Sequence, residues 1–241
     1  MKIKNLDFLA IGVHPDDVEL GCGGTILKHI DLGYKVGIVD LTKGELGTRG
    51  TATTRKKEAE AARKFAKVAV RENLGMADGF IANNKENKLK IIKSIRKYRP
   101  EIILANSVTD RHPDHGNAAK LVSEACFLSG LLKIKTKSGK TNQAPWRPRK
   151  VLHYIQDHYI KPDIVVDISM YMDKKIKLVK CFETQFYQKD SKGPKTPISS
   201  KSFLDGLRGR SQDFGRRIAV EYGEGFTCHE YIGVSDLKDI L

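Results

Sequence analysis

Short apolar runs alternate with longer amphipathic stretches along most of the chain. The apolar runs predict five strands, at residues 6–13, 35–41, 101–105, 151–155 and 164–168. The first runs are continuously apolar, which is typical of strands that are buried on both faces of a parallel sheet. The alternation of strands and helices therefore predicts an α/β fold, with a mostly parallel sheet and helices on both of its faces.

The stretches between these runs show the apolar spacing that is typical of helices. Six helices are expected, at residues 19–31, 53–70, 86–98, 115–132, 172–185 and 203–222. Three polar segments are expected to be loops, at residues 42–52, 133–149 and 187–200. We see no boundary within the 241 residues and expect one domain, residues 1–241.

The composition is that of a soluble globular protein, with 40% hydrophobic and 30% charged residues. The first apolar run is about seven residues long and ends in His-Pro-Asp-Asp, which is too short for a signal peptide or a membrane span. We therefore expect a cytoplasmic protein without a membrane partner. The four cysteines are widely spaced along the chain and are expected to be free thiols.

The chain has a formal net charge of +14, from 43 Lys and Arg against 29 Asp and Glu. Such an excess attracts anionic partners, either nucleic acid or small acidic substrates. The basic residues are spread along helical stretches and are not interleaved with aromatic residues, which make up only 7%. This pattern favours a small acidic substrate, and we expect no nucleic-acid partner.

The tripeptide His-Pro-Asp occurs twice, each time after a predicted strand. Residues 14–17 read His-Pro-Asp-Asp, and residues 112–115 read His-Pro-Asp-His. Ligands of open parallel sheets bind beyond the carboxyl ends of the strands, so both motifs are expected at the same edge. Packed carboxylates and imidazoles are costly unless a positive charge joins them, and a divalent metal supplies that charge.

Imidazole and carboxylate donors suit Zn²⁺, and three protein ligands leave the open position that catalysis requires. His14 and Asp17 lie three residues apart on a turn that enters a helix, so both can face one point, and His115 can supply the third ligand. Asp16 and His112 would then flank the metal at positions suited to proton transfer. The alternative is a purely structural role, in which Asp16 or Asp17 caps the helix and the histidines form hydrogen bonds within loops.

A dinucleotide site is a competing interpretation, because Gly21, Gly23 and Gly24 follow the first strand and Asp40 ends the second. The spacing of these glycines departs from G-x-G-x-x-G, and the acidic residues at the turn would repel a pyrophosphate. We expect the glycines to let the first helix pack closely on the sheet.

With their neighbours, the motifs resemble the zinc-dependent N-acetylglucosaminyl deacetylase family, which is LmbE- and PIG-L-like. The shared segments are Gly-Val-His-Pro-Asp-Asp-Val-Glu at 12–19 and Asp-Arg-His-Pro-Asp-His at 110–115. Further segments resemble the bacillithiol-biosynthesis branch, at residues 41–51, 161–168, 185–187, 195–197 and 222–226. The resemblance covers essentially the whole chain and implies a Rossmann-like, LmbE-like fold.

The resemblance implies a metal-dependent amidohydrolase that deacetylates N-acetyl-α-D-glucosaminyl L-malate, a small anionic sugar substrate. It implies one zinc ion per chain, with His14, Asp17 and His115 as ligands and Asp16 as the general base. A protonated His112 would stabilise the tetrahedral intermediate or protonate the leaving amine. Relatives assemble as hexamers, so a homo-oligomer is expected.

Further residues take roles from the same resemblance. Asp114 would orient the imidazole at the start of the second motif, and Glu45 and Arg55 match positions that line the sugar pocket. Arg55 and Arg111 are loop arginines that could clamp a malate carboxylate. Some relatives place a tyrosine in the loop after Lys-Thr-Pro to bind the oxyanion, and the nearest aromatic residue here is Phe203.

Two other functions stay open. The first is deacetylation of another N-acetylglucosaminide, such as diacetylchitobiose. The second belongs to a different class, a non-catalytic basic metal-site protein that binds nucleic acid. Iron or cobalt would accept the same ligands as zinc.

Overall fold

The computed structural model describes residues 5–189 and 193–240, and its main sheet has the strand order β3-β2-β1-β4-β7-β9-β8. The strands are β1 (Phe8–Gly12), β2 (Val36–Thr42), β3 (Val70–Met76), β4 (Ile102–Ala105), β7 (Lys150–Tyr154), β8 (Ile164–Asp167) and β9 (Gly223–Thr227). Strands from β3 to β7 pair in parallel, whereas β9 pairs antiparallel with both β7 and β8. The predicted α/β fold with a mostly parallel sheet is confirmed.

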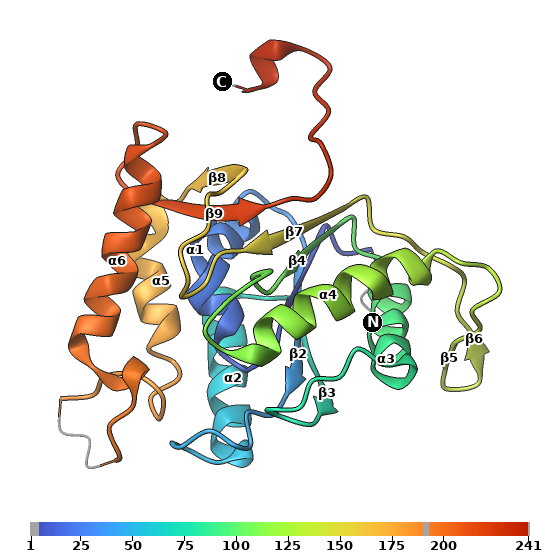
Figure 1. Cartoon of the computed structure of the whole chain (residues 1–241), viewed down its shortest axis with the longest axis horizontal. Helices are drawn as coiled ribbons and strands as arrows, with labels where there is room; N and C mark the ends of the chain where they lie inside the picture. Colours follow the sequence, from blue (N-terminus) through green and yellow to red (C-terminus); the bar gives the residue numbers. More distant parts are fainter. Residues whose placement is uncertain (1–4, 190–192, 241) are drawn as a thin grey trace.

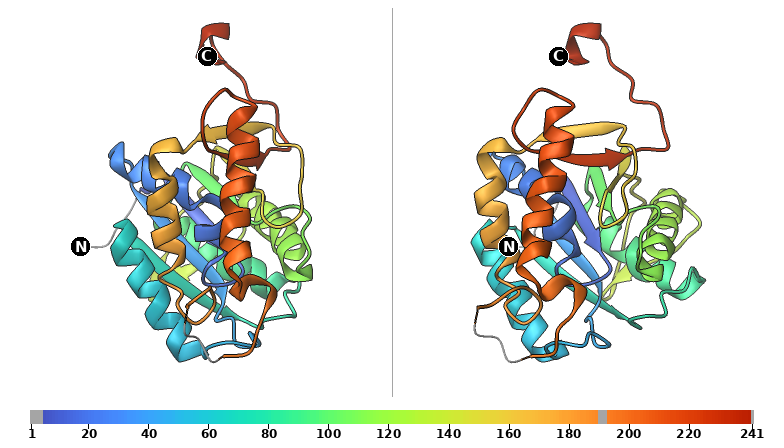
Figure 2. Two further views of the ribbon diagram at one scale, coloured as in Figure 1. Left: turned by 90° about the vertical axis from the view of Figure 1, so that its left-hand side faces the viewer. Right: turned by 60° about the vertical axis from the view of Figure 1, so that its left-hand side comes forward.

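Helices cover both faces of this sheet (Figures 1 and 2). On one face lie α1 (Asp17–Asp31), α2 (Ala52–Ala66), α5 (Met172–Val179) and α6 (Lys201–Arg216). On the other face lie α3 (Lys85–Tyr98) and α4 (Pro113–Ser129). Short 3₁₀ helices occur at Ser169–Tyr171, Pro197–Ser199 and Leu237–Ile240.

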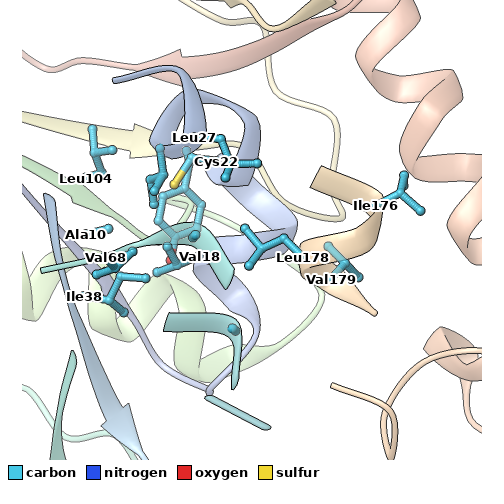
Figure 3. Close-up of a cluster of buried hydrophobic side chains, with 14 of the residues drawn as sticks. Ala10, Val18, Cys22, Leu27, Ile38, Val68, Leu104, Ile176, Leu178 and Val179 are labelled. Carbon is cyan, nitrogen blue, oxygen red and sulfur yellow. The ribbon is translucent and has the colours of Figure 1, made fainter. Parts of the chain in front are cut away.

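The sheet separates two hydrophobic cores. Ala10 of β1 belongs to the core beneath α1, whereas its neighbours Leu9 and Ile11 belong to the core beneath α3 and α4. This division follows from the strand geometry, since successive side chains point to opposite faces. Figure 3 shows the first core, in which Val18 and Cys22 of α1 pack together with residues of the strands and of α5.

The strand order reverses beside β1. The chain runs from β1 to β2 and β3 on one side, and then crosses to β4 on the other side of β1. The connections that leave β1 and β4 diverge at this point, which is where open α/β sheets bind their ligands. The first His-Pro-Asp motif directly follows β1 and the second follows β4 after a short loop, so the topology places residues 14–17 and 112–115 at one edge.

Two strands of the main sheet were not predicted. The expected helix at 53–70 ends at Ala66, because Lys67 takes a left-handed conformation with φ 59°, and β3 follows it. The residues of β3 are largely polar and partly exposed, as suits an edge strand, so they carry no apolar signal. Likewise α6 ends at Arg216 rather than at residue 222, and β9 begins at Gly223, where two glycines interrupt the apolar pattern.

Other boundaries differ less. Helix α5 ends at Val179 rather than at residue 185, and the expected loop at 133–149 contains the hairpin of β5 (Lys137–Ser138) and β6 (Thr141–Asn142). In the expected loop at 187–200, residues 190–192 lie outside the described residues.

All four cysteines are free thiols. Across residues 5–189 and 193–240, no helix has the length and apolar character needed to cross a bilayer.

The glycines of α1 allow a close approach to the sheet. A Cβ atom at Gly21 would lie 2.2 Å from Cδ2 of Tyr154, and one at Gly24 would lie 2.7 Å from Cδ1 of Ile168. The Tyr154 ring is held in place because its hydroxyl donates a hydrogen bond to the Ile11 carbonyl at 3.0 Å. The close packing that we expected of these glycines is confirmed.

Helix α1 is broken at Cys22, which has φ −140° and ψ 25°. The break exposes backbone N–H groups inside the helix, and the Glu224 carboxylate accepts those of Gly24 at 2.9 Å and Thr25 at 2.7 Å. Lys175 Nζ lies 2.6 Å from the same carboxylate, and both side chains are 2% exposed. The buried Glu224–Lys175 ion pair therefore fixes the second part of α1, beyond the break at Cys22.

We predict that Lys175→Met destabilises the protein far more than Lys174→Met. Removal of one partner leaves the Glu224 charge buried and unpaired, which costs about 3–5 kcal/mol. The neighbouring Lys174 forms an exposed pair with Asp31 at 3.2 Å, with side chains 54% and 47% exposed, and is the matched control. Its loss is expected to cost at most about 1 kcal/mol. Urea unfolding measures both free energies, and equal effects would contradict the prediction.

Candidate metal and catalytic site

The two His-Pro-Asp motifs meet beyond the carboxyl ends of β1 and β4. His14 follows β1, Asp17 begins α1, and His115 lies in the first turn of α4; one donor atom from each lies within 4.8 Å of the others. His14 Nδ1 and His115 Nε2 are 3.4 Å apart, and they lie 3.7 and 3.3 Å from the carboxylate oxygens of Asp17. The structure thus brings together the three residues that the sequence predicted as ligands.

The outward nitrogens of the two histidines each face a carboxylate. His14 Nε2 lies 2.8 Å from Asp78 Oδ1, and His115 Nδ1 lies 2.6 Å from Asp110 Oδ2. Because a carboxylate only accepts, each ring carries a proton on its outward nitrogen, and a neutral ring keeps a lone pair on the inward one. Two lone pairs and the Asp17 carboxylate then face one another, and this donor set fits a divalent cation such as zinc.

The raised pKa values of His14 and His115 indicate that their surroundings favour positive charge. Burial lowers the pKa of His14, but the hydrogen bonds to Asp17 and Asp78 outweigh it and raise that pKa to about 10. Burial also lowers the pKa of His115, and Asp17 and Asp110 raise it to about 9. A divalent cation stabilises the same cluster by taking the place of these protons.

The Asp17 carboxylate is fixed from several directions. Its Oδ2 accepts the backbone N–H of His14 at 2.9 Å and the side-chain amide of Asn106 at 3.0 Å, and its Oδ1 accepts from Gln156 at 3.2 Å. Burial would raise the pKa of Asp17, but His115 and His14 hold it well below its usual range. Asp17 is therefore an ionised, preorganised donor.

Asp16, the predicted base, is buried and has φ 151° and ψ −19°, a conformation that residues with a side chain rarely adopt. Its Oδ2 accepts a hydrogen bond from Arg55 Nη2 at 3.0 Å. Burial raises the pKa of Asp16, and the Arg55 charge offsets part of this rise, leaving it at about 7. A carboxyl with that pKa can accept or release a proton near neutrality.

Arg55 is held by the backbone as well as by Asp16. Its guanidinium donates to the carbonyls of Pro15 at 3.1 Å and Gly44 at 3.3 Å. Gly44 has φ +64°, and a Cβ atom there would lie 1.8 Å from Arg55 Nη1. Arg55 lines the pocket, as predicted, and its partners there are Asp16 and two backbone carbonyls; substrate binding by Arg55 stays a prediction.

His112 is the N-cap of α4, and its Nδ1 accepts the backbone N–H of Asp114 at 3.3 Å. The N-cap position explains this contact, because the first N–H groups of a helix lack intrahelical partners. Burial, followed by the nearby His14 and His115, lowers the pKa of His112. This shift favours a neutral ring, whose proton would then lie on Nε2; a protonated His112 during the reaction stays a prediction.

The structure shows no hydrogen bond between the Asp114 carboxylate and this ring among the described residues. Asp114 Oδ1 accepts the backbone N–H of Ile81 at 3.1 Å, and Oδ2 is buried without a hydrogen-bond partner among the described residues. The backbone of Asp114, and not its carboxylate, orients His112. One carboxylate oxygen of Asp114 nevertheless lies within 4.8 Å of ring nitrogens of His112 and His14.

Glu45 and Arg111 are both exposed and already have partners. Glu45 accepts the backbone N–H groups of Lys43 at 3.2 Å and Asp78 at 3.1 Å, and it is not among the described residues that line the pocket. Arg111 lines the rim, where its Nε lies 3.0 Å from Asp157 Oδ2. Substrate binding by Glu45 and Arg111 stays a prediction.

One cavity of about 390 Å³ contains the whole cluster, and its size is that of a small-molecule site. Sequence reasoning missed Asp78, Asp110, Gln156 and Arg210, which also line it. Asp110 stands two residues before the second motif, and the need of a metal-binding histidine for a carboxylate at its other nitrogen would have indicated it. Asp78 follows the strand that was not predicted.

Asp40 is the residue that a dinucleotide site would use to bind the ribose, but here its carboxylate forms an ion pair with Arg71. Arg71 donates to both oxygens of Asp40 at 2.8 Å and also pairs with Glu19. The end of β2 is thus closed by a buried ion network. This arrangement agrees with the expectation that the chain does not bind a dinucleotide there.

Comparison with known proteins finds a protein family whose model covers both His-Pro-Asp motifs. Residues 9–126 match the PIG-L model, described as GlcNAc-PI de-N-acetylase. A diacetylchitobiose deacetylase from Thermococcus kodakarensis is 32% identical over 74% of this chain and 69% of its own length. A 4-oxalmesaconate hydratase from Pseudomonas putida is 26% identical, with 73% of each chain covered.

Solved structures show the same fold. The conserved protein TT1542 from Thermus thermophilus superposes with a TM-score of 0.83 and 32% identity, covering 95% of this chain and 98% of its own. An N,N'-diacetylchitobiose deacetylase from Pyrococcus horikoshii, complexed with its inhibitor MPG, superposes with a TM-score of 0.78 and 26% identity. That match covers 99% of this chain and 89% of the Pyrococcus chain.

We predict that Asp78→Ala and Asp110→Ala each weaken zinc binding roughly 10- to 100-fold, because carboxylates behind metal-binding histidines fix the ring orientation and basicity. Competition with a chromophoric chelator measures the affinity. Asp31→Ala removes an exposed carboxylate on the far end of α1 and serves as the control. Wild-type affinity in both pocket variants would exclude this role for the two carboxylates.

Proposed function

The chain belongs to the PIG-L family of GlcNAc-PI de-N-acetylases, and we propose that it removes the acetyl group from an N-acetylglucosamine unit of a small sugar conjugate. It is a hydrolytic enzyme that acts on an acetamide. The observation that carries the proposal is the convergence of three inward-facing donors beside Asp16, a buried carboxyl whose pKa is about 7.

His14, Asp17 and His115 would hold one zinc ion, which supplies a Lewis acid for the acetyl carbonyl and lowers the pKa of water. Asp16 takes the proton of the attacking water, since it is adjacent to this cluster and titrates near neutrality. Arg55 keeps part of the Asp16 population ionised at neutral pH by stabilising its negative charge.

His112 supplies a hydrogen-bond donor for the oxygen of the tetrahedral intermediate. With Nδ1 accepting the Asp114 N–H, the neutral ring presents Nε2–H to the pocket that it lines. A preorganised donor of this kind is typically worth about 3–4 kcal/mol of the barrier. Phe203 also lines the pocket but has no hydroxyl, so the tyrosine contribution expected in some relatives is missing from this position.

Two substrates remain candidates. The diacetylchitobiose deacetylases among the relatives support diacetylchitobiose better than they support N-acetylglucosaminyl malate. A different observation favours the malate conjugate. Arg210 lines the pocket and has no hydrogen bond or ion pair with another described residue, so it could bind a carboxylate of the substrate. A homo-oligomer, a cytoplasmic location and the absence of a nucleic-acid partner stay predictions.

We predict that Asp16→Asn lowers kcat by about 10²- to 10⁴-fold, because the amide cannot take the proton from water. The zinc content is expected to stay at that of the wild type, since Asp16 is not one of the three converging donors. Fluorescamine detection of free amine gives the rate, and elemental analysis gives the metal content. Asp213→Asn, an exposed substitution on α6, is the control. A variant with wild-type rates would refute the assignment of Asp16 as base.

We predict that the purified zinc enzyme releases acetate and amine in equal amounts from an N-acetylglucosaminide. Diacetylchitobiose and N-acetylglucosaminyl malate are compared at equal concentration, with kcat/KM as the readout. Acetate release also separates amide hydrolysis from a hydratase reaction, which matters because one relative is named a hydratase. Retention on DNA in a salt-dependent manner, without any amine, would instead favour the nucleic-acid-binding alternative.

A further inference from the structure

Helix α6 presents one face to the pocket. Phe203, Leu207 and Arg210 line the cavity together with the metal-site residues, and they are spaced four and three residues apart, as on one side of a helix. Two apolar side chains are therefore followed, one turn on, by a cation. Sequence reasoning assigned no role to Arg210.

Arg210 differs from the other arginines that we considered as substrate clamps. Arg55 binds Asp16 and two carbonyl groups, and Arg111 pairs with Asp157. Arg210 is only partly exposed, yet its guanidinium has no hydrogen bond and no ion pair within the part of the chain that the structure describes. Burial lowers its pKa, and the more distant Asp157, Glu224 and Asp110 raise it in part.

Each of these three carboxylates is already bound to another cation or donor. Glu224 pairs with Lys175 at 2.6 Å, Asp157 pairs with Arg111 at 3.0 Å, and Asp110 binds His115 at 2.6 Å as well as two backbone N–H groups. A half-buried guanidinium is costly when it lacks an anion. Since the described part of the protein supplies none, Arg210 is available to bind an anion that enters the pocket.

We propose that Arg210 binds a carboxylate on the aglycone of the substrate, so that the enzyme selects N-acetylglucosaminides with an acidic aglycone over neutral ones. The inference rests on the proposed deacetylation and names its substrate class. A guanidinium offers a planar pair of donors that matches a carboxylate. The sugar ring then lies against Phe203 and Leu207, while the acetamide reaches the cluster of His14, Asp17 and His115.

The exposed Arg111 is the weaker candidate for this contact. Its side chain is 46% exposed and its partner Asp157 is 44% exposed, and pairs of this kind contribute little in water. A substrate carboxylate at Arg111 would also have to displace Asp157. At Arg210 it displaces no hydrogen bond or ion pair, because none joins this side chain to another described residue.

The experiment compares N-acetylglucosaminyl malate with diacetylchitobiose in the zinc-loaded wild type and in Arg210→Gln, Arg210→Lys and Arg216→Gln. Arg216 lies on the same helix but is exposed and outside the pocket, so its variant loses the same charge without the proposed contact. The quantity measured is the ratio of kcat/KM for the malate conjugate to kcat/KM for diacetylchitobiose.

Arg210→Gln is expected to lower this ratio roughly 10- to 100-fold, as the loss of a hydrogen bond between charged groups does, mainly through the KM of the acidic substrate. Arg210→Lys keeps the charge and is expected to lower the ratio less, and Arg216→Gln is expected to leave it unchanged. An unchanged ratio in Arg210→Gln, or an equal loss on both substrates, overturns the inference.

A second measurement is independent of turnover. L-malate is titrated into the wild type and into Arg210→Gln while the arginine Nε–H signals are followed by NMR. If the wild type releases no amine from either substrate, the proposed function fails, and this titration still decides the inference. A malate-dependent shift of the Arg210 signal, with binding lost in the variant, supports it; equal binding by both proteins overturns it.

Discussion

Three potential metal ligands converge on one point at the edge of the sheet, where a single divalent cation could bind all of them. His14 Nδ1, His115 Nε2 and the Asp17 carboxylate lie within 4.8 Å of each other. A divalent cation would replace the protons that His14 and His115 otherwise take up, and the chain must hold the three positions before it binds. Much of the surrounding structure can be understood as support for this one arrangement.

That support comes from several strands at once. Asp78 follows β3, Asn106 follows β4 and Gln156 follows β7, and each contacts one of the three donors. The α1 segment that begins with Asp17 is pressed against the sheet, since Gly21 leaves no room between the helix and the Tyr154 ring. The parallel topology therefore does more than gather the motifs, because it also surrounds each donor with a fixed partner.

The sequence predicted the parts of the site that are written in short motifs. The repeated His-Pro-Asp identified the ligand candidates and Asp16, because strand ends in a parallel sheet meet at one edge. It did not indicate Asp78, which follows a polar edge strand without an apolar pattern, or Arg210, which lies about a hundred residues beyond the second motif. Such partners are distant in the sequence and meet only through the packing of the fold, which neither motif spacing nor composition predicts.

Arg55 shows the same limit in another way, because the sequence could place it near the pocket but could not show which group it binds. The structure makes its neighbour Gly44 unexpectedly important. Any side chain at position 44 would occupy the space of the guanidinium and drive it away from Asp16. Without that positive charge, the buried carboxyl would stay protonated to a higher pH. The pH at which the Asp16 carboxyl loses its proton is thus set, in part, by a residue that has no functional group.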